Sequence, residues 1–230
     1  MSGLVNKGRA MTTKKIEHSS EKVAQIHREL HSHLPPEPAL RVKALESLLV
    51  EKGMVDPGAI DAWVQLYSED IGPKRGAQMV AKAWCDAAFK ERLLSDGAAA
   101  AVEMGFAGWG SGHLKAVANG PQVHNMVVCT LCSCYPLAIL GIPPTWYKTA
   151  AYRARAVREP RAVLTEFGVE LAEEVQVRVW DSTAELRYLV IPERPAGTDD
   201  WSEDQLAAIV SRNAMIGTER DLAPTSQGGN

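Results

Sequence analysis

Three of the four cysteines of this chain, Cys129, Cys132 and Cys134, lie within six consecutive positions, whereas Cys85 stands far away. Thiolates are soft, strongly donating ligands, so three sulfurs on one short segment could face a single metal ion. A disulfide between Cys132 and Cys134 is disfavoured because only one residue separates them. Buried unpaired cysteines are the other structural interpretation. The tight clustering favours a metal site.

The spacing of these cysteines differs from that of ordinary zinc sites. Zinc sites usually combine one Cys-x-x-Cys with a second Cys or His pair well downstream, and no such pair follows here. His113 or His124 could complete a site of three cysteines and one histidine. His124 lies in a run that predicts a strand, which favours a structural role for it.

Two thiolates bracket the peptide nitrogens of Ser133 and Cys134 in the segment Cys132-Ser133-Cys134. A metal held by both sulfurs would lie against these nitrogens. Only a strongly Lewis-acidic ion would displace their amide protons, which points to trivalent cobalt or iron rather than zinc.

The segment Val-Cys-Thr-Leu-Cys-Ser-Cys-Tyr-Pro, ending at Pro136, resembles the metal-claw motif of the nitrile hydratase alpha subunit. The resemblance covers roughly residues 39 to 218. It continues through Leu140–Lys148, Tyr152–Arg155, Val157–Arg161, Val179–Asp181, Glu185–Tyr188 and Pro192–Thr198.

The resemblance implies a complete ligand set. The metal ligands would be the sulfurs of Cys129, Cys132 and Cys134 with the backbone nitrogens of Ser133 and Cys134, which leaves a sixth position for water or substrate. Thr130 resembles the cobalt type, whereas iron members usually carry Ser there. We therefore expect one Co3+ per subunit, with iron as the less favoured metal. Cys132 and Cys134 would be oxidised to sulfinic and sulfenic acids.

The implied activity is that of a hydro-lyase that hydrates nitriles to amides. The metal would act as Lewis acid, an oxidised Cys134 as nucleophile or general base toward water, and Ser133 would orient the sixth ligand. Three thiolates and two deprotonated amides exceed the charge of a trivalent ion by two. The resemblance implies that arginines of a beta subunit supply the missing cations. We expect an alpha-beta heterodimer, assembled as α2β2, a small nitrile substrate and a metallochaperone.

Two alternatives from other classes stay open. A thiocyanate hydrolase gamma subunit has the same claw, although the Trp180-Asp181 strand and the lack of a long insertion before the claw argue against it. A non-catalytic zinc protein could use the same three cysteines. Elemental analysis separates this second alternative from a cobalt or iron enzyme.

Composition narrows the class of protein. A formal net charge of −3 offers no basic footprint for nucleic acid. No apolar run approaches the ~20 residues that span a bilayer. Residues 1 to 20 are polar and lysine-bearing, unlike a secretory signal. Four cysteines do not form a disulfide scaffold in a chain of 230 residues. We expect a cytoplasmic protein.

The order of elements predicts an α+β fold, a helical arm followed by a domain that carries the cysteine loop. The resemblance implies a layered α-β-β-α arrangement for that domain. We predict a flexible N-terminal extension over residues 1–38, a helical arm over 39–105, an α/β metal-binding catalytic domain over 106–217 and a disordered tail over 218–230.

Local patterns predict individual elements. Val42, Leu45, Leu48 and Leu49 form an apolar stripe in a helix that ends at Gly53. Aspartates are expected as helix caps, and Ser202 to Gln205 has the spacing of a capping box. The expected aspartate caps are Asp56, Asp86 and Asp96. We predict a helix over Thr145–Arg158, a strand over Val123–Val128, and a strand over Val175–Val179 that turns at Asp181–Thr183 to pair with Leu186–Ile191.

Several further residues carry expectations. His27 and His31 share a helix face but lack a third ligand, so we expect them to be solvated. Glu103 matches a Gln or Glu position that the family places near the metal, yet its sequence context is that of an ordinary helix carboxylate. Cys85 is expected to be a small packing residue. The arginines at 153, 155, 158 and 161 predict a subunit interface.

Overall fold

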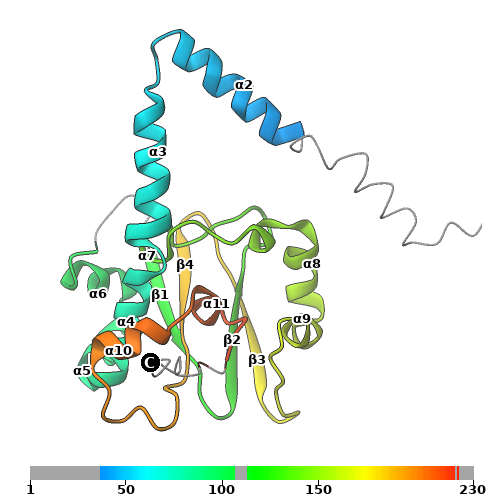
Figure 1. Ribbon diagram of the computed structural model, residues 1–230. Helices are drawn as coiled ribbons and strands as arrows, with labels where there is room; N and C mark the ends of the chain where they lie inside the picture. The colour runs from blue at the N-terminus through cyan, green and yellow to red at the C-terminus, as the bar shows by residue number, and fades with distance from the viewer. Residues whose placement is uncertain (1–36, 107–112, 221, 223–230) are drawn as a thin grey trace, which may run out of the picture. The chain divides into compact units, whose positions relative to one another are not determined.

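The computed structural model describes residues 37–106, 113–220 and 222, apart from the side chains of residues 69 and 70 (Figure 1). Residues 1–36 of the extension predicted over 1–38, with His27 and His31, therefore lie outside the described residues, and its last two residues belong to a helix that begins at Glu37. Contacts divide the chain into two compact units, Met1–Ala59 and Ile60–Asn230. None of the described helices is long and apolar enough to cross a bilayer.

Helix α2, Glu37–Glu51, is the main described element of the first unit, and α3, Pro57–Gln65, follows it. The chain leaves α2 at Gly53, whose φ of +66° is a conformation that favours glycine. The side chain of Asp56 accepts a hydrogen bond from the amide of Gly58 at 2.9 Å, which confirms the predicted cap. α2 buries none of its residues; Val42, Leu45 and Leu48 of its predicted apolar stripe are exposed, and Leu49 is half-buried.

The second unit begins with a run of helices. The side chains of Asp86 and Asp96 each accept a hydrogen bond of 3.0 Å, from the amides of Phe89 and Ala99, which confirms both predicted caps. A cis peptide bond joins Gly72 to Pro73. The elements of this run are the π-helix η1 (Leu66–Ile71), α4 (Lys74–Cys85), α5 (Ala87–Ser95) and α6 (Gly97–Glu103).

The described strands form two parallel pairs. β1, His113–Ala118, pairs with β4, Leu186–Ile191, and β2, Val123–Val128, pairs with β3, Gln176–Asp181. The predicted pairing of the third strand with the fourth is therefore wrong. A turn signal and an alternating pattern do not identify a strand's partner, and the buried Leu189 and Val190 place β4 beside β1 in the core.

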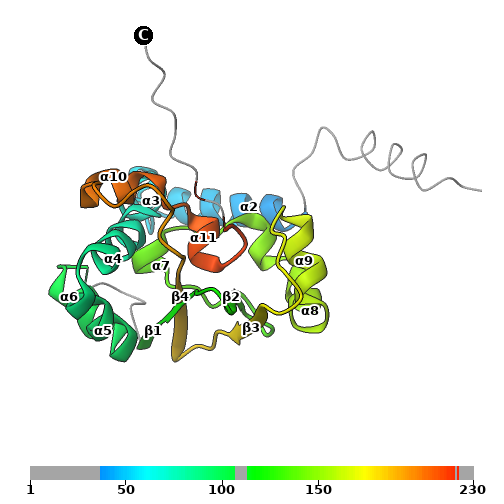
Figure 2. The ribbon, with the colours of Figure 1, turned by 90° about the horizontal axis from the view of Figure 1, so that it is seen from below.

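The second unit has the expected α-β-β-α layers (Figure 2). Helices α5 and α6 pack on β1, and α8 and α9 pack on β2 and β3 at the opposite side. The short helix α11 contacts both β2 and β4, and α10 packs on α4. The bounds are α7 (Leu137–Leu140), η2 (Thr145–Lys148), α8 (Ala150–Arg158), α9 (Pro160–Glu166), α10 (Glu203–Ile209) and α11 (Arg212–Ile216).

The predicted helix over Thr145–Arg158 is divided in two. The first part is a 3-10 helix, Thr145–Lys148. Thr149 follows it and caps α8, because its hydroxyl accepts a hydrogen bond of 3.2 Å from the amide of Tyr152. The division follows from this cap, because Ser and Thr side chains compete with the helical hydrogen-bond ladder. By contrast, the capping box from Ser202 to Gln205 is present as predicted.

One hydrophobic core joins the helices to the strands. Met79 of α4 and Phe89 of α5 are fully buried in the same cluster as Met126 of β2 and Leu189 of β4. The division of the chain at residue 105 stays a prediction.

The described start of the predicted tail is packed. Thr218 is 1% exposed and Leu222 is 5% exposed, so the expectation of disorder is wrong for these residues. Leu222 belongs to the hydrophobic core, which explains why the described start of the tail is packed. Residues 223–230 lie outside the described residues.

Gly217 provides a test of this packing. Its φ is +90°, and a Cβ there would overlap the carbonyl oxygen of Asn125 on β2. Gly168 has a similar φ of +81° but has open space around it. We expect Gly168→Ala to cost about 1–2 kcal/mol of unfolding free energy from backbone conformation alone. Gly217→Ala should cost at least about 3 kcal/mol, because steric overlap is added.

Urea unfolding of both variants measures the difference. Equal losses of unfolding free energy in Gly217→Ala and Gly168→Ala would contradict the close approach of α11 to β2.

Candidate metal centre

The predicted cysteine cluster lies in an irregular loop at the end of β2, and we call residues 129–134 the claw loop. Cys129 directly follows the strand and is buried, Cys134 is half-buried and Cys132 is exposed. The sulfurs of Cys129 and Cys132 are 3.6 Å apart, and those of Cys132 and Cys134 are 3.4 Å apart. All three sulfurs lie within 4.8 Å of one another. The loop thus gathers its sulfurs at a partly open surface.

The pKa shifts of Cys132 and Cys134 favour the binding of a cation by the cluster. Hydrogen bonds from the Cys134 thiol and the Ser133 amide lower the pKa of Cys132. Burial, with the neighbouring sulfurs, raises the pKa of Cys134 to about 12. The cluster therefore accommodates a first negative charge more readily than further ones, because adjacent thiolates repel each other. A multivalent ion removes this conflict, since metal binding deprotonates coordinating thiols.

A carboxylate from the neighbouring strand holds the loop. Asp181 ends β3 and pairs in register with Val128, the last residue of β2. One oxygen of its carboxylate accepts a hydrogen bond from the amide of Thr130 at 2.9 Å, and the other accepts one from the Thr130 hydroxyl at 2.6 Å. Such paired bonds fix the backbone directly after Cys129.

Two buried tyrosines hold the backbone on either side of the sulfurs. The hydroxyl of Tyr147 donates to the carbonyl of Cys134 at 2.9 Å, and that of Tyr152 donates to the carbonyl of Val127 at 2.6 Å. Burial raises the pKa of both phenols, so they stay protonated donors. Arg153 adds a hydrogen bond of 3.3 Å from Nη1 to the carbonyl of Thr130.

Neither candidate histidine joins the three-cysteine group found among the described residues. His124 is buried, its Nε2 lies 2.8 Å from the carbonyl oxygen of Gly217, and burial lowers its pKa. It is the structural histidine that its strand context predicted. His113 is exposed at the start of β1.

Glu103 and Cys85 take no part in the claw loop's hydrogen bonds. Glu103 is exposed and forms two 3.0 Å hydrogen bonds with Arg92, which lower the pKa of its carboxyl. This is the ordinary helix carboxylate that its context indicated. Cys85 is exposed, so its predicted role as a packing residue is wrong. It is the last residue of α4, whose buried face is formed by residues of preceding turns, such as Met79 and Val80.

The structure adds Asp181, Tyr147, Tyr152 and Arg153 as supports of the loop, roles that sequence reasoning missed. The order of strands and helices along the chain does not show that the end of β3 meets the end of β2. A signal was available for all four residues, because each lies in a segment that resembles the family.

The family model described as "Nitrile hydratase, alpha chain" matches residues 36–219. This chain belongs to that family. The chain is also 52% identical over 187 residues to the low-molecular-weight cobalt-containing nitrile hydratase subunit alpha of Rhodococcus rhodochrous, a match that covers 81% of this chain and 90% of the relative. The resemblance of the claw segment thus extends over most of the sequence.

Other members and neighbours of the family share the fold. A double mutant of Fe-type nitrile hydratase from Comamonas testosteroni Ni1 is 44% identical with a TM-score of 0.74, and the match covers 79% of this chain and 89% of that chain. The thiocyanate hydrolase subunit gamma of Thiobacillus thioparus is 44% identical over 186 residues, which cover 76% of each chain. Identity and coverage are both higher for the cobalt-containing nitrile hydratase subunit.

Asp181 yields a prediction about metal retention. Asp181→Ala removes both acceptors from Thr130, so the backbone after Cys129 loses its anchor. Loss of such an outer support typically lowers metal affinity by about 10–100-fold. We expect less metal per chain after dialysis against a chelator, measured by elemental analysis. Asp200→Ala, at an exposed position, is the control and should match the parent chain. Equal metal retention in both variants would remove Asp181 from this role.

Proposed function

We propose that this chain is the alpha subunit of a nitrile hydratase, which hydrates nitriles to amides. The observation that carries the proposal is the convergence of three sulfurs within 4.8 Å on the loop that follows β2. Support comes from family membership and from 52% identity to a cobalt-containing nitrile hydratase alpha subunit.

The residues proposed to hold the metal are Cys129, Cys132 and Cys134 through sulfur, with the backbone nitrogens of Ser133 and Cys134. We propose one Co3+ per chain, and iron is the alternative because Fe-type neighbours share the fold. Such an ion, when bound, supplies Lewis acidity that polarises a nitrile carbon or lowers the pKa of water. Burial of Cys129 and partial exposure of the other two cysteines leave one side of the site open to substrate.

The chain's own residues are proposed to act as follows. An oxidised Cys134 serves as nucleophile or general base toward water, and Ser133 orients the group that faces the nitrile. Tyr147 keeps the backbone of Cys134 in place through its hydrogen bond to the carbonyl. Oxidation of Cys132 and Cys134 is part of the proposal, and peptide mass spectrometry that finds both fully reduced in active enzyme would refute it.

A second subunit is part of the proposal because the claw loop is open. Leu131, between two of the cysteines, is 84% exposed, and Cys132 is exposed as well. An anionic centre needs pairing or hydrogen bonding, at a cost of several kcal/mol otherwise. We propose a beta subunit that covers the loop and supplies cations, an α2β2 assembly, loading by a metallochaperone, and a cytoplasmic location. The chain purified alone should show little turnover.

Cys129→Ala tests the ligand assignment. The variant, coexpressed with the beta subunit, should lose stoichiometric cobalt and amide formation, because a thiolate is lost from a site with no spare ligand. Cys85→Ala is the matched control, since Cys85 is exposed and outside the sulfur cluster. It should keep both cobalt and activity. The measurements are elemental analysis and chromatographic detection of amide from nitrile.

Three outcomes would overturn the proposal. Zinc in the parent complex would support a non-catalytic zinc protein, and full cobalt occupancy in Cys129→Ala would refute the ligand set. Consumption of thiocyanate without nitrile hydration would favour the related thiocyanate hydrolase activity.

Leu137 is a departure from the family pattern that concerns substrate size. The family pattern that the claw segment resembles continues as Cys-Tyr-Pro-Trp-Pro, whereas this chain has Leu137 and Ala138 after Pro136. Leu137 is half-buried and begins α7, three residues after Cys134. A smaller side chain leaves more room, so we propose that this chain favours bulkier or aromatic nitriles.

Leu137→Trp should shift relative kcat/KM toward small aliphatic nitriles. A size series of nitriles measures the shift, and Val102→Trp, at an exposed position on α6, controls for the added indole. Unchanged relative kcat/KM in Leu137→Trp would exclude Leu137 from the substrate pocket.

A further inference from the structure

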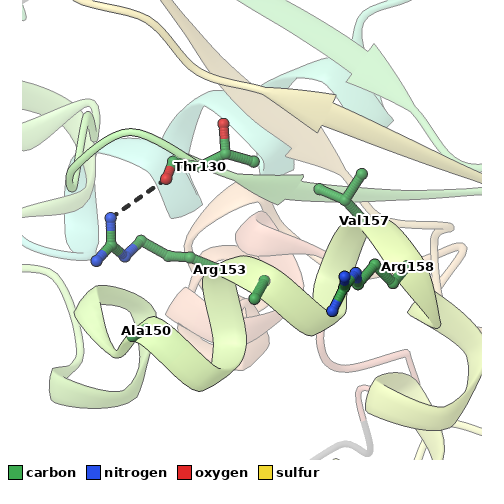
Figure 3. Close-up of a pocket in the computed structure, with 6 residues that line it drawn as sticks. Thr130, Ala150, Arg153, Val157 and Arg158 are labelled. Atoms are coloured by element: carbon green, nitrogen blue, oxygen red, sulfur yellow. Dashed lines mark hydrogen bonds between the residues drawn. The ribbon is translucent and has the colours of Figure 1, made fainter.

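An open groove runs between the claw loop and helix α8 (Figure 3). Its volume is about 440 Å³. Thr130 of the claw loop forms one side, and residues of α8 form the other. The lining residues are Thr130, Ala150, Arg153, Ala154, Val157 and Arg158.

The groove carries two cations from α8 and no anion of its own. Arg153 and Arg158 both line it, and no acidic residue does. Neither guanidinium forms an ion pair with a carboxylate in the part of the chain that the structure describes. The Nε atom of Arg153 is buried and has no hydrogen-bond partner among the described residues. This is unusual for a buried guanidinium nitrogen, which normally finds an acceptor.

The neighbouring arginine on the same helix shows the contrast. Arg155 pairs with Glu159 at 2.6 Å and with Glu166 at 2.6 Å, so its charge is balanced within the chain. Three of the four predicted arginines lie on α8, and Arg161 lies on α9, where it donates to backbone carbonyls. Arg155 is neutralised within the chain, whereas Arg153 and Arg158 keep their positive charge at the groove.

The groove is continuous with an exposed apolar surface. Val157, in the groove, is 52% exposed, and Leu131, next to Thr130, is 84% exposed. Ala154 and Val157 lie between the two arginines in the sequence, and such a surface suits a polypeptide that places a carboxylate near each guanidinium and covers the apolar rim. Guanidinium groups bind carboxylates through paired, charge-assisted hydrogen bonds.

We propose that this groove binds carboxylate side chains of the partner subunit, one at Arg153 and one at Arg158, which lie at its two ends (Figure 3). The inference rests on the proposed function, because it requires the second subunit. Arg153 also donates to the carbonyl of Thr130, so a carboxylate that fixes this guanidinium steadies the claw loop as well. The Arg153 side chain thereby couples docking of the partner subunit to ordering of the claw loop.

Charge reversal at Arg158 tests the contact in the purified two-subunit complex. We expect Arg158→Glu to weaken subunit association by about tenfold or more, because two like charges then meet. Arg178→Glu is the control, since Arg178 lies on β3 outside the groove. It should change the dissociation constant by less than about twofold. The difference between the variants should shrink as salt rises from about 0.05 M to about 0.5 M.

Carbodiimide coupling then identifies the carboxylate. In the Arg158→Lys variant, the amine at position 158 should form an amide bond with an Asp or Glu of the partner, found by peptide mass spectrometry. Linkage only to carboxylates of this chain, or none, would overturn the inference, as would unaltered association of Arg158→Glu. Cobalt content and nitrile hydration of the parent complex are measured in parallel. If both are intact while the groove tests fail, only this inference is lost, whereas their absence overturns the proposed function itself.

Discussion

The position of the claw loop depends on the parallel pairing of β2 with β3. This pairing places Asp181 beside the residues that leave β2, where the carboxylate accepts hydrogen bonds from both the amide and the hydroxyl of Thr130. Tyr152 holds the carbonyl of Val127 one residue before the end of the strand. The loop has no regular secondary structure, so these contacts with neighbouring elements determine where its sulfurs lie.

Charge is the second constraint on this site. Three sulfurs lie within 4.8 Å of one another; hydrogen bonds lower the pKa of Cys132, whereas burial, together with the neighbouring sulfurs, raises the pKa of Cys134. A multivalent cation would offset the charge of the thiolates, but deprotonated amides would then leave the centre anionic. Among the described residues, Arg153 donates a hydrogen bond to a carbonyl of the claw loop rather than to a sulfur. The second subunit proposed above would supply the balancing charge.

Helix α8 links these two constraints. Its buried Tyr152 supports the strand, its Arg155 is paired within the chain, and its Arg153 and Arg158 line the groove beside Thr130. One helix therefore contributes to the core, to the support of the loop and to a charged surface.

The sequence alone identified the features that depend on neighbouring residues. The three-cysteine cluster, the aspartate caps at 86 and 96, the capping box from Ser202 to Gln205 and the strand over Val123–Val128 were all predictable because spacing within a few residues specifies them. The α+β class followed from the order of such elements. The structural role of His124 was likewise evident from its strand.

Only the tertiary structure decided what meets across the chain. Local alternation predicted a hairpin between β3 and β4, yet burial of apolar faces pairs each with an earlier strand, and this pairing brings Asp181 to Thr130. The exposure of Cys85 and the packing of Leu222 depend in the same way on distant partners. Sequence spacing specifies which side chains share a face, but the free energy of the assembled core selects what that face contacts.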